Sequence, residues 1–247
     1  MIRTLLWTML LSVTVMAQDI YATFNVQADK TANLVLAASG LIKTVHADVG
    51  DKVKKGEVLL ELDSDDLKTS VVLAQKKVEL SEVNLRFAKK SYERYAKVKE
   101  VVDESEFDKY VSAYERAKIE LSKAKANLKY KRALLAKTRL RAPFSGTISA
   151  KMVEVGDGVS AAMMPTLFTL MTPQKQKLIV LIDEKYWQKV KVGQTFTYSV
   201  DGRQKKLTTK VSKIYPSIDP KRRAITLEMP VKGLKVGLFG QGSLKVD

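Results

Sequence analysis

The chain has 247 residues, enough to bury a core and to form one to three domains. It carries 43 Lys and Arg against 27 Asp and Glu, a formal net charge of +16, and it has no Cys, which excludes disulfides and thiolate chemistry. The positive charge suits an anionic membrane surface or acidic partners, and simple solubility explains it equally well.

Residues 1–17 resemble a secretory signal peptide. Arg3 precedes an apolar run from Leu5 to Met16, and Ala17 follows as the cleavage position. The run is about a dozen residues, short for the roughly 20 that span a bilayer, so we expect cleavage near Ala17; an uncleaved anchor is the alternative. The mature protein is then expected in a bacterial periplasm, where nucleic acid is not an expected partner.

Two copies of one pattern lie 106 residues apart. Ser39 to Val53 (SGLI…VGDKV) is repeated at Ser145 to Val159 (SGTI…VGDGV). Each copy predicts a strand, a tight Gly-Asp turn and a second strand. Neither copy can bury a core alone, so we expect the two to close on each other. The segment between them must therefore leave and return at one place, as an inserted hairpin.

The insert contains neither Gly nor Pro, and it predicts an α-helical hairpin. Apolar or small residues recur at alternating steps of four and three, the seam of a coiled coil. The arms break between about Glu100 and Glu104, and Ser105 with the acidic residues after it is the expected N-cap of the second helix. The expected seam is Leu67, Val71, Ala74, Val78, Ser81, Leu85, Ala88, Tyr92 and Tyr95 in the first arm, and Phe107, Tyr110, Tyr114, Ala117, Leu121, Ala124, Leu128, Lys131 and Leu135 in the second.

The C-terminal part is rich in alternating apolar residues and turns, which predicts a small antiparallel barrel. A strand from the N-terminal side is expected to join it. The expected elements are strands Tyr21–Gln27, Lys177–Asp183, Gln194–Val200, Lys206–Ile214, Ala224–Val231 and Gln241–Val246, and a short helix at Glu184–Val190.

The two repeated halves resemble those of a biotinyl or lipoyl domain. With the hairpin and barrel, they make the chain resemble a periplasmic adaptor, or membrane fusion protein, of the HlyD-like family in tripartite efflux pumps. The runs VGDKVKKGEVL (49–59) and RAPFSGTI (141–148) are typical of that family. The resemblance implies an elongated α+β fold with a barrel (18–37 and 173–247), a split lipoyl-like domain (38–64 and 138–172) and an α-helical hairpin (65–137).

The resemblance also implies partners. An adaptor links an inner-membrane transporter to an outer-membrane channel of the TolC type, and copies assemble, by resemblance as a hexamer. We expect a proton-driven transporter of the resistance–nodulation–division (RND) class. An ATP-driven (ABC) exporter and an exported coiled-coil scaffold without a transport role are the alternatives. The chain is expected to be a minimal adaptor without the membrane-proximal domain of larger members.

Two candidate contact sites follow. Adaptors that dock TolC-type channels carry Arg, Leu four residues later and Ser seven after that. Arg94, Val98 and Ser105 hold this spacing, with Val in place of Leu; an ordinary surface Arg, a seam residue and a cap are the alternative. The second candidate is a basic turn that faces the pump or the membrane, or is merely exposed; its residues are Lys221, Arg222 and Arg223.

No enzymatic, cofactor or metal site is expected. Asp66 stands where a lipoyl domain carries its modified Lys, and a carboxylate cannot form that amide. His46 is the only His and is expected to be a surface or packing residue. Met163, Met164 and Met171 could suggest soft metal ligands, but with no further Met pair or His nearby we expect them to fill the core or a loop.

Overall fold

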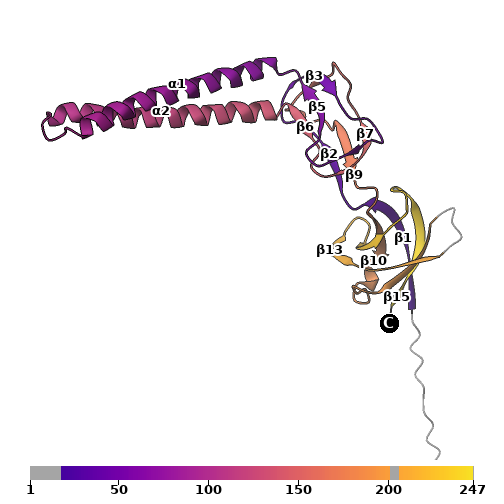
Figure 1. The fold of residues 1–247 in the computed structure, drawn as a ribbon. Helices are drawn as coiled ribbons and strands as arrows, with labels where there is room; N and C mark the ends of the chain where they lie inside the picture. The colour runs from indigo at the N-terminus through magenta and orange to yellow at the C-terminus, as the bar shows by residue number, and fades with distance from the viewer. Residues whose placement is uncertain (1–17, 201–205, 247) are drawn as a thin grey trace, which may run out of the picture. The chain divides into compact units, whose positions relative to one another are not determined.

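The computed structural model describes residues 18–200 and 206–246, and the predicted signal peptide lies outside them. The chain divides into two compact units, residues 1–31 with 171–247 and residues 32–170. The first consists of strands, and the second combines strands with two long helices (Figure 1). The fold is therefore of the predicted α+β class.

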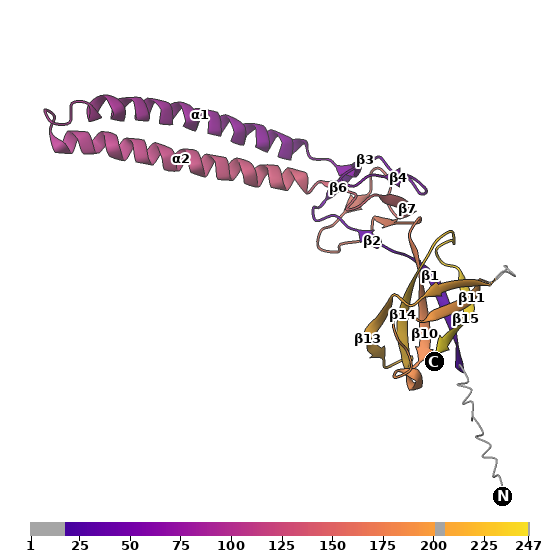
Figure 2. The ribbon, with the colours of Figure 1, turned by 60° about the horizontal axis from the view of Figure 1, so that its bottom comes forward.

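The unit of residues 32–170 contains a β-sandwich, and Figure 2 labels several of its strands. One sheet has the strand order β2-β9-β7-β4 and the other β6-β5-β3-β8. The strands are β2 (Thr31–Leu34), β3 (Gly40–Val45), β4 (Lys52–Val53), β5 (Val58–Leu62), β6 (Arg139–Arg141), β7 (Gly146–Lys151), β8 (Gly158–Val159) and β9 (Phe168–Met171).

The two repeated copies pair reciprocally. Gly40 in β3 lies opposite Val159 in β8, and Gly146 in β7 lies opposite Val53 in β4, so each copy pairs its first strand with the second strand of the other. The turns follow the same rule. The N–H of Gly50 donates to the carbonyl of Ile148 at 2.9 Å, and the N–H of Gly156 donates to the carbonyl of Ile42 at 2.9 Å. The duplication therefore builds a pseudo-twofold sandwich that neither copy forms alone.

The sandwich core draws on both copies. Ile42 and Ile148 occupy equivalent positions and are 2% and 1% exposed. Leu34 and Leu36 are buried in the same core. Residues 32–37, which we expected to belong to the barrel, therefore pack with the sandwich.

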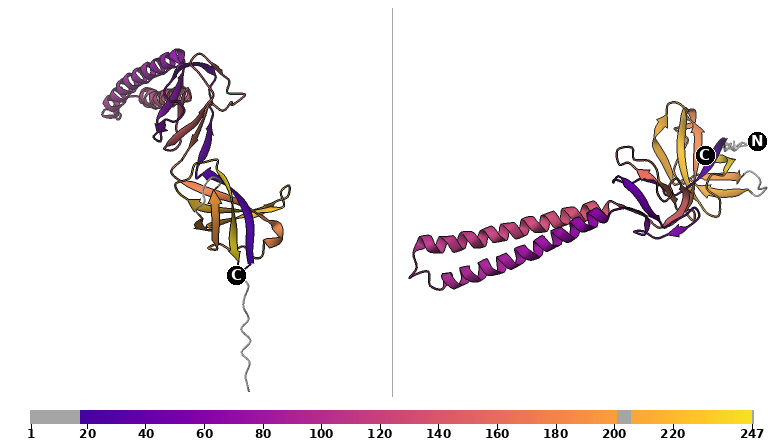
Figure 3. Two further views of the ribbon diagram at one scale, coloured as in Figure 1. Left: turned by 90° about the vertical axis from the view of Figure 1, so that its right-hand side faces the viewer. Right: turned by 90° about the horizontal axis from the view of Figure 1, so that it is seen from above.

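The insert forms two antiparallel helices, α1 (Asp65–Ala96) and α2 (Glu104–Ala136), which lie side by side in both views of Figure 3. Every predicted seam position is buried or half-buried. Ala74, Val78, Ala124 and Leu128 form the most buried apolar cluster, in the half of the hairpin nearer the sandwich. The small Ala side chains allow the close approach of the two helices there.

Backbone and side-chain bonds fix the base of the hairpin to the sandwich. The N–H of Leu62 donates to the carbonyl of Thr138 at 2.9 Å, and β5 and β6 are paired strands. Lys43 of β3 lies 2.8 Å from the carboxylate of Asp65 and 3.5 Å from that of Asp63. The two arms therefore leave and return at one place, as the repeat predicted.

The other unit is one antiparallel sheet with the order β12-β11-β15-β1-β10-β14-β13. The sheet curls so that β12, at one end, reaches β14, next to the other end: the Thr209 hydroxyl of β12 donates to the carbonyl of Pro230 of β14 at 2.8 Å. Its strands are β1 (Gln18–Ala28), β10 (Gln176–Asp183), β11 (Thr195–Val200), β12 (Leu207–Lys210), β13 (Lys213–Asp219), β14 (Ala224–Val231) and β15 (Phe239–Val246).

Two expectations for the barrel are wrong. The predicted strand over 206–214 is two strands, because Val211 turns into the core and the N–H of Ser212 bonds to the carbonyl of Glu228 at 3.0 Å. The predicted helix over 184–190 is a single 3₁₀ turn, η1 (Glu184–Tyr186). Val190, beyond that turn, is 7% exposed and belongs to the barrel core.

Candidate functional site: the hairpin tip

The three predicted docking residues lie at the end of the hairpin distant from the sandwich. Arg94 is in the last turn of α1, Val98 is in the connecting turn, and Ser105 is in the first turn of α2. All three are exposed. Arg94 Nη2 lies 3.5 Å from Ser91 Oγ, a weak contact that leaves most of the guanidinium edge toward solvent. The fold thus gathers these residues at one exposed end.

The role predicted for Ser105 as the N-cap is wrong. Helix α2 begins at Glu104, and Asp103 is the cap. The Asp103 carboxylate accepts hydrogen bonds from the backbone N–H of Ser105 at 2.9 Å and of Glu106 at 3.4 Å. The positive end of the helix dipole favours an acidic cap such as Asp103. The Ser105 hydroxyl is therefore not used for capping.

Stacked aromatic rings hold the distal third of the hairpin. The Tyr92 ring stacks on Phe107 and Tyr114, with centroids 6.0 and 5.2 Å apart, and Tyr95 stacks on Tyr110 at 3.7 Å. A hydrogen bond with the Tyr95 side chain raises the pKa of Tyr110 to about 12. Aromatic side chains have only two rotatable bonds and are therefore stiff. These stacks hold α1 and α2 together just below the tip.

One apolar residue at the tip was not among the predicted contacts. Val101, in the turn between the helices, is 86% exposed, while Val98 is 43% exposed. The N–H of Val101 donates to the carbonyl of Val98 at 3.0 Å, which keeps the two side chains on one short turn. The sequence held one indication of this exposed residue: Val101 lies in the break between the arms and belongs to neither seam.

The second candidate, the basic turn, lies in the barrel unit. Lys221 and Arg222 follow β13, and Asp219 accepts from both of their backbone N–H groups at 2.9 and 3.2 Å. Arg223 adopts φ +49°, and its guanidinium bonds to Glu184 at 2.7 Å. All three basic side chains are exposed.

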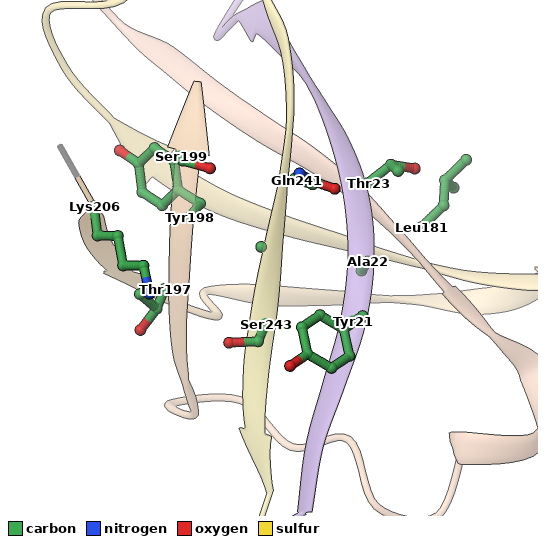
Figure 4. Close-up of a pocket in the computed structure, with 11 residues that line it drawn as sticks. Tyr21, Ala22, Thr23, Leu181, Thr197, Tyr198, Ser199, Lys206, Gln241 and Ser243 are labelled. Atoms are coloured by element: carbon green, nitrogen blue, oxygen red, sulfur yellow. The ribbon is translucent and has the colours of Figure 1, made fainter. Parts of the chain in front are cut away.

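A hollow of about 550 Å³ lies on the outer face of the barrel (Figure 4). Hydroxyl and amide side chains of β1, β11 and β15 line it, with Lys206 as the one charged residue among those lining it. This lining contains no carboxylate or imidazole that could act as a general acid or base. The residues are Tyr21, Ala22, Thr23, Leu181, Thr197, Tyr198, Ser199, Lys206, Gln241, Gly242 and Ser243.

The residues considered as metal ligands from the sequence are His46, Met163, Met164 and Met171. His46 is exposed after β3, Met163 is 82% and Met164 59% exposed, and Met171 ends β9. Over residues 18–200 and 206–246, no group of three or more His, Cys, Asp or Glu is placed to hold a metal ion. Within the same ranges, neither long helix is apolar enough to cross a membrane.

Comparison with known proteins places this geometry in a family. Residues 30–171 match the family described as CzcB-like, barrel-sandwich hybrid domain. The cobalt-zinc-cadmium resistance protein CzcB of Cupriavidus metallidurans is 26% identical over 223 residues, 85% of this chain and 42% of that protein. The multidrug resistance protein MdtA of Xenorhabdus bovienii is 25% identical over 139 residues, 56% of this chain and 34% of that protein. The chain thus spans less than half the length of these curated relatives.

Solved structures share the fold. MacA from Actinobacillus actinomycetemcomitans has a TM-score of 0.72 at 20% identity, with 94% of this chain and 79% of that chain covered. A MacA-MexA chimera with the α-hairpin domain of Pseudomonas aeruginosa MexA has a TM-score of 0.70 at 21% identity, with 94% and 83% covered. The family match covers more than half of this chain, which confirms the predicted resemblance: the chain belongs to the CzcB-like barrel-sandwich hybrid family of membrane fusion proteins.

Proposed function

We propose that this chain is a periplasmic adaptor that joins an inner-membrane efflux transporter of the RND class to an outer-membrane channel of the TolC type. In this role the chain carries no catalysis and no cofactor. Its work is to hold a conduit together and to pass motion of the transporter to the channel. The observation that carries the proposal is the hairpin inserted between the two halves of the sandwich, with Arg94, Val98 and Ser105 exposed at its far end.

The hairpin suits this role because it is stiff along its length. Its seam side chains alternate as in a coiled coil, and the aromatic stacks continue the contact to the tip. Polar contacts also bridge the arms: Arg132 donates to Gln75 at 2.9 Å, and Lys125 lies 3.3 Å from Glu82. A displacement imposed at the base therefore reaches the tip without being absorbed by bending.

The tip offers three kinds of contact to a helical partner. The Arg94 guanidinium can form a bidentate bond with a carboxylate or bind backbone carbonyls. Val98 and Val101 supply a small apolar surface that excludes water from that bond. The Ser105 hydroxyl, free of the capping role, can donate or accept.

We further propose that copies of the chain pack side by side as a ring, of six by resemblance. Helix α1 carries Leu73, Leu80 and Phe87 at intervals of seven residues, each more than half exposed. Residues seven apart lie on one helix face, so the three form an apolar stripe on the outer face of α1, away from the seam. This stripe gives the hairpins of neighbouring copies a surface for lateral contact.

Crosslinking in whole cells tests the docking proposal, since the chain has no Cys of its own. A single Cys introduced as Arg94→Cys or Ser105→Cys is expected to crosslink to an outer-membrane channel. Ser122→Cys, exposed midway along α2, is the matched control and is expected not to. Tip crosslinks that form only between copies, or not at all, would overturn the docking proposal.

The identity of a copurifying inner-membrane protein decides between the remaining alternatives. An RND transporter supports the proposal. An ABC exporter in its place keeps the adaptor role and corrects the energy source. Recovery of neither, with no crosslink to a channel from the tip Cys variants, would favour the exported scaffold.

A further inference from the structure

We propose that one end of the barrel is a docking surface for an anionic phospholipid bilayer. Two loops form it, residues 184–192 and 218–223, and we call them the basic loop pair. The inference goes beyond the adaptor function, because joining a transporter to a channel does not itself require a contact with lipid.

The two loops are held together as one surface. Asp183 at the end of β10 pairs with Ala224 at the start of β14, so both loops leave the sheet at the same end. The N–H of Glu184 donates to the carbonyl of Arg223 at 3.0 Å, and Arg223 Nε donates to the Glu184 carboxylate at 2.7 Å. Arg223 holds φ +49°, a conformation that favours glycine, so this clamp is retained against backbone strain.

The first loop presents apolar side chains outward while it is anchored inward. Tyr186 packs partly on the barrel core and Val190 is 7% exposed. Trp187 and Val192, next to these anchors, are each 62% exposed. Ile218 at the edge of the second loop is 43% exposed. An exposed Trp on an anchored loop is suited to the boundary between headgroups and acyl chains, where its apolar ring and polar N–H are both satisfied.

Positive charge surrounds these apolar residues. Asp183 and Asp219 accept backbone N–H bonds that shape the two loops. Each of the three carboxylates also pairs with a cation: Asp183 with Lys185 at 3.4 Å, Asp219 with Arg222 at 3.7 Å, and Glu184 with Arg223. The basic residues outnumber them two to one. They are Lys185, Lys189, Lys191, Lys221, Arg222 and Arg223, against Asp183, Glu184 and Asp219.

The gap between the loops has room for a headgroup. A hollow of about 580 Å³ there is lined by Lys185, Arg222 and Arg223, together with Asp183 and Glu184, which two of these cations neutralise. Guanidinium and ammonium groups beside an apolar rim match the chemistry of a phosphodiester headgroup over acyl chains. Each basic side chain close to an anionic bilayer strengthens binding about five-fold.

Vesicle cosedimentation of the mature full chain tests the proposal. The protein is expected to bind vesicles of phosphatidylglycerol and phosphatidylcholine, to bind pure phosphatidylcholine much more weakly, and to be released by salt. The double variant Lys221→Glu/Arg222→Glu is expected to weaken binding by at least about 25-fold, and Trp187→Ala by about ten-fold. The matched controls are Lys123→Glu/Lys129→Glu and Tyr130→Ala, exposed positions on the hairpin that are expected to leave binding unchanged.

Three results would overturn the lipid assignment: no preference for the anionic vesicles, equal losses in the control variants, or a photocrosslinker at position 187 that captures only a membrane protein in cells. The last result would assign the basic loop pair to the transporter. Crosslinks from the hairpin tip do not depend on this surface, so its failure and that of the docking proposal are distinguishable.

Discussion

Leu62 and Thr138 are 76 positions apart in sequence, yet the N–H of the first donates a 2.9 Å hydrogen bond to the carbonyl of the second. This bond closes the base of the hairpin. It ties the last residue of β5 to the residue that precedes β6, so the sandwich and both helix ends share one junction. A force on the sandwich must therefore act on both arms together.

The barrel leaves no space for a side chain at the glycines of β15, Gly240 and Gly242. A Cβ at Gly242 would lie 2.5 Å from the carbonyl of Thr197 and 2.6 Å from the Phe196 ring. Gly242→Ala is therefore expected to lower the free energy of unfolding of the barrel by about 1–3 kcal/mol, because the core ring must move. Gly158→Ala, where nothing lies within 4 Å of the added Cβ, is the control in denaturant titrations. Equal effects of the two changes would contradict the packing described.

The cap of α2 gives a second prediction. Asp103→Ala is expected to destabilise the first turn of α2 by about 1 kcal/mol, and Ser105→Ala to have little effect on it. Amide hydrogen exchange of Ser105 and Glu106 measures this directly, since Asp103 accepts from both groups. Faster exchange of Glu106 in Ser105→Ala than in Asp103→Ala would restore Ser105 as the cap.

The ion pairs at the hairpin base predict that the stability of this junction depends on pH. Hydrogen bonds from Lys43 and then Lys68 lower the pKa of Asp65 from 3.8 to about 2. Because the folded pKa is depressed, the stabilisation is complete above the unfolded pKa and is lost as the pH falls toward 2. A carboxyl NMR titration is expected to show this low pKa, and Lys43→Met is expected to raise it toward 3.8. An unchanged titration in the variant would remove Lys43 as the cause.

The apolar stripe on α1 predicts an effect on assembly. Leu80→Glu places a charge in the proposed lateral contact and is expected to weaken self-association at least ten-fold in sedimentation equilibrium, with unchanged helix content. Lys89→Glu, on the other flank of α1, is the control. Oligomerisation that survives Leu80→Glu would show that the stripe does not join copies.

Sequence patterns predicted the parts of the fold that repeat. The repeat at an offset of 106 residues appears in the structure as the reciprocal pairs Gly40 with Val159 and Val53 with Gly146. This was predictable because similar sequences favour similar turns and strands. The helical seam was equally predictable, since alternating steps of four and three select one face over many turns.

The remaining features depend on contacts that local patterns do not carry. The division of residues 206–214 into two strands follows from the bond between Ser212 and Glu228. Glu184, which begins the 3₁₀ turn, is bound by Arg223, 39 positions later in the sequence. At the tip, Ser105 was the expected cap; Ser and Asp are both favoured at the N-cap, and the helix begins one residue after Asp103.

Affinity purification of the tagged chain from cells, with Arg94→Glu as the variant, tests the central claim most directly. The wild-type chain is expected to recover an inner-membrane transporter and an outer-membrane channel together. Arg94→Glu is expected to keep the transporter and to lose the channel, because the charge reversal affects the hairpin tip and leaves the barrel unchanged. Retention of the channel by the variant, or loss of both partners together, would contradict an adaptor that docks by its tip.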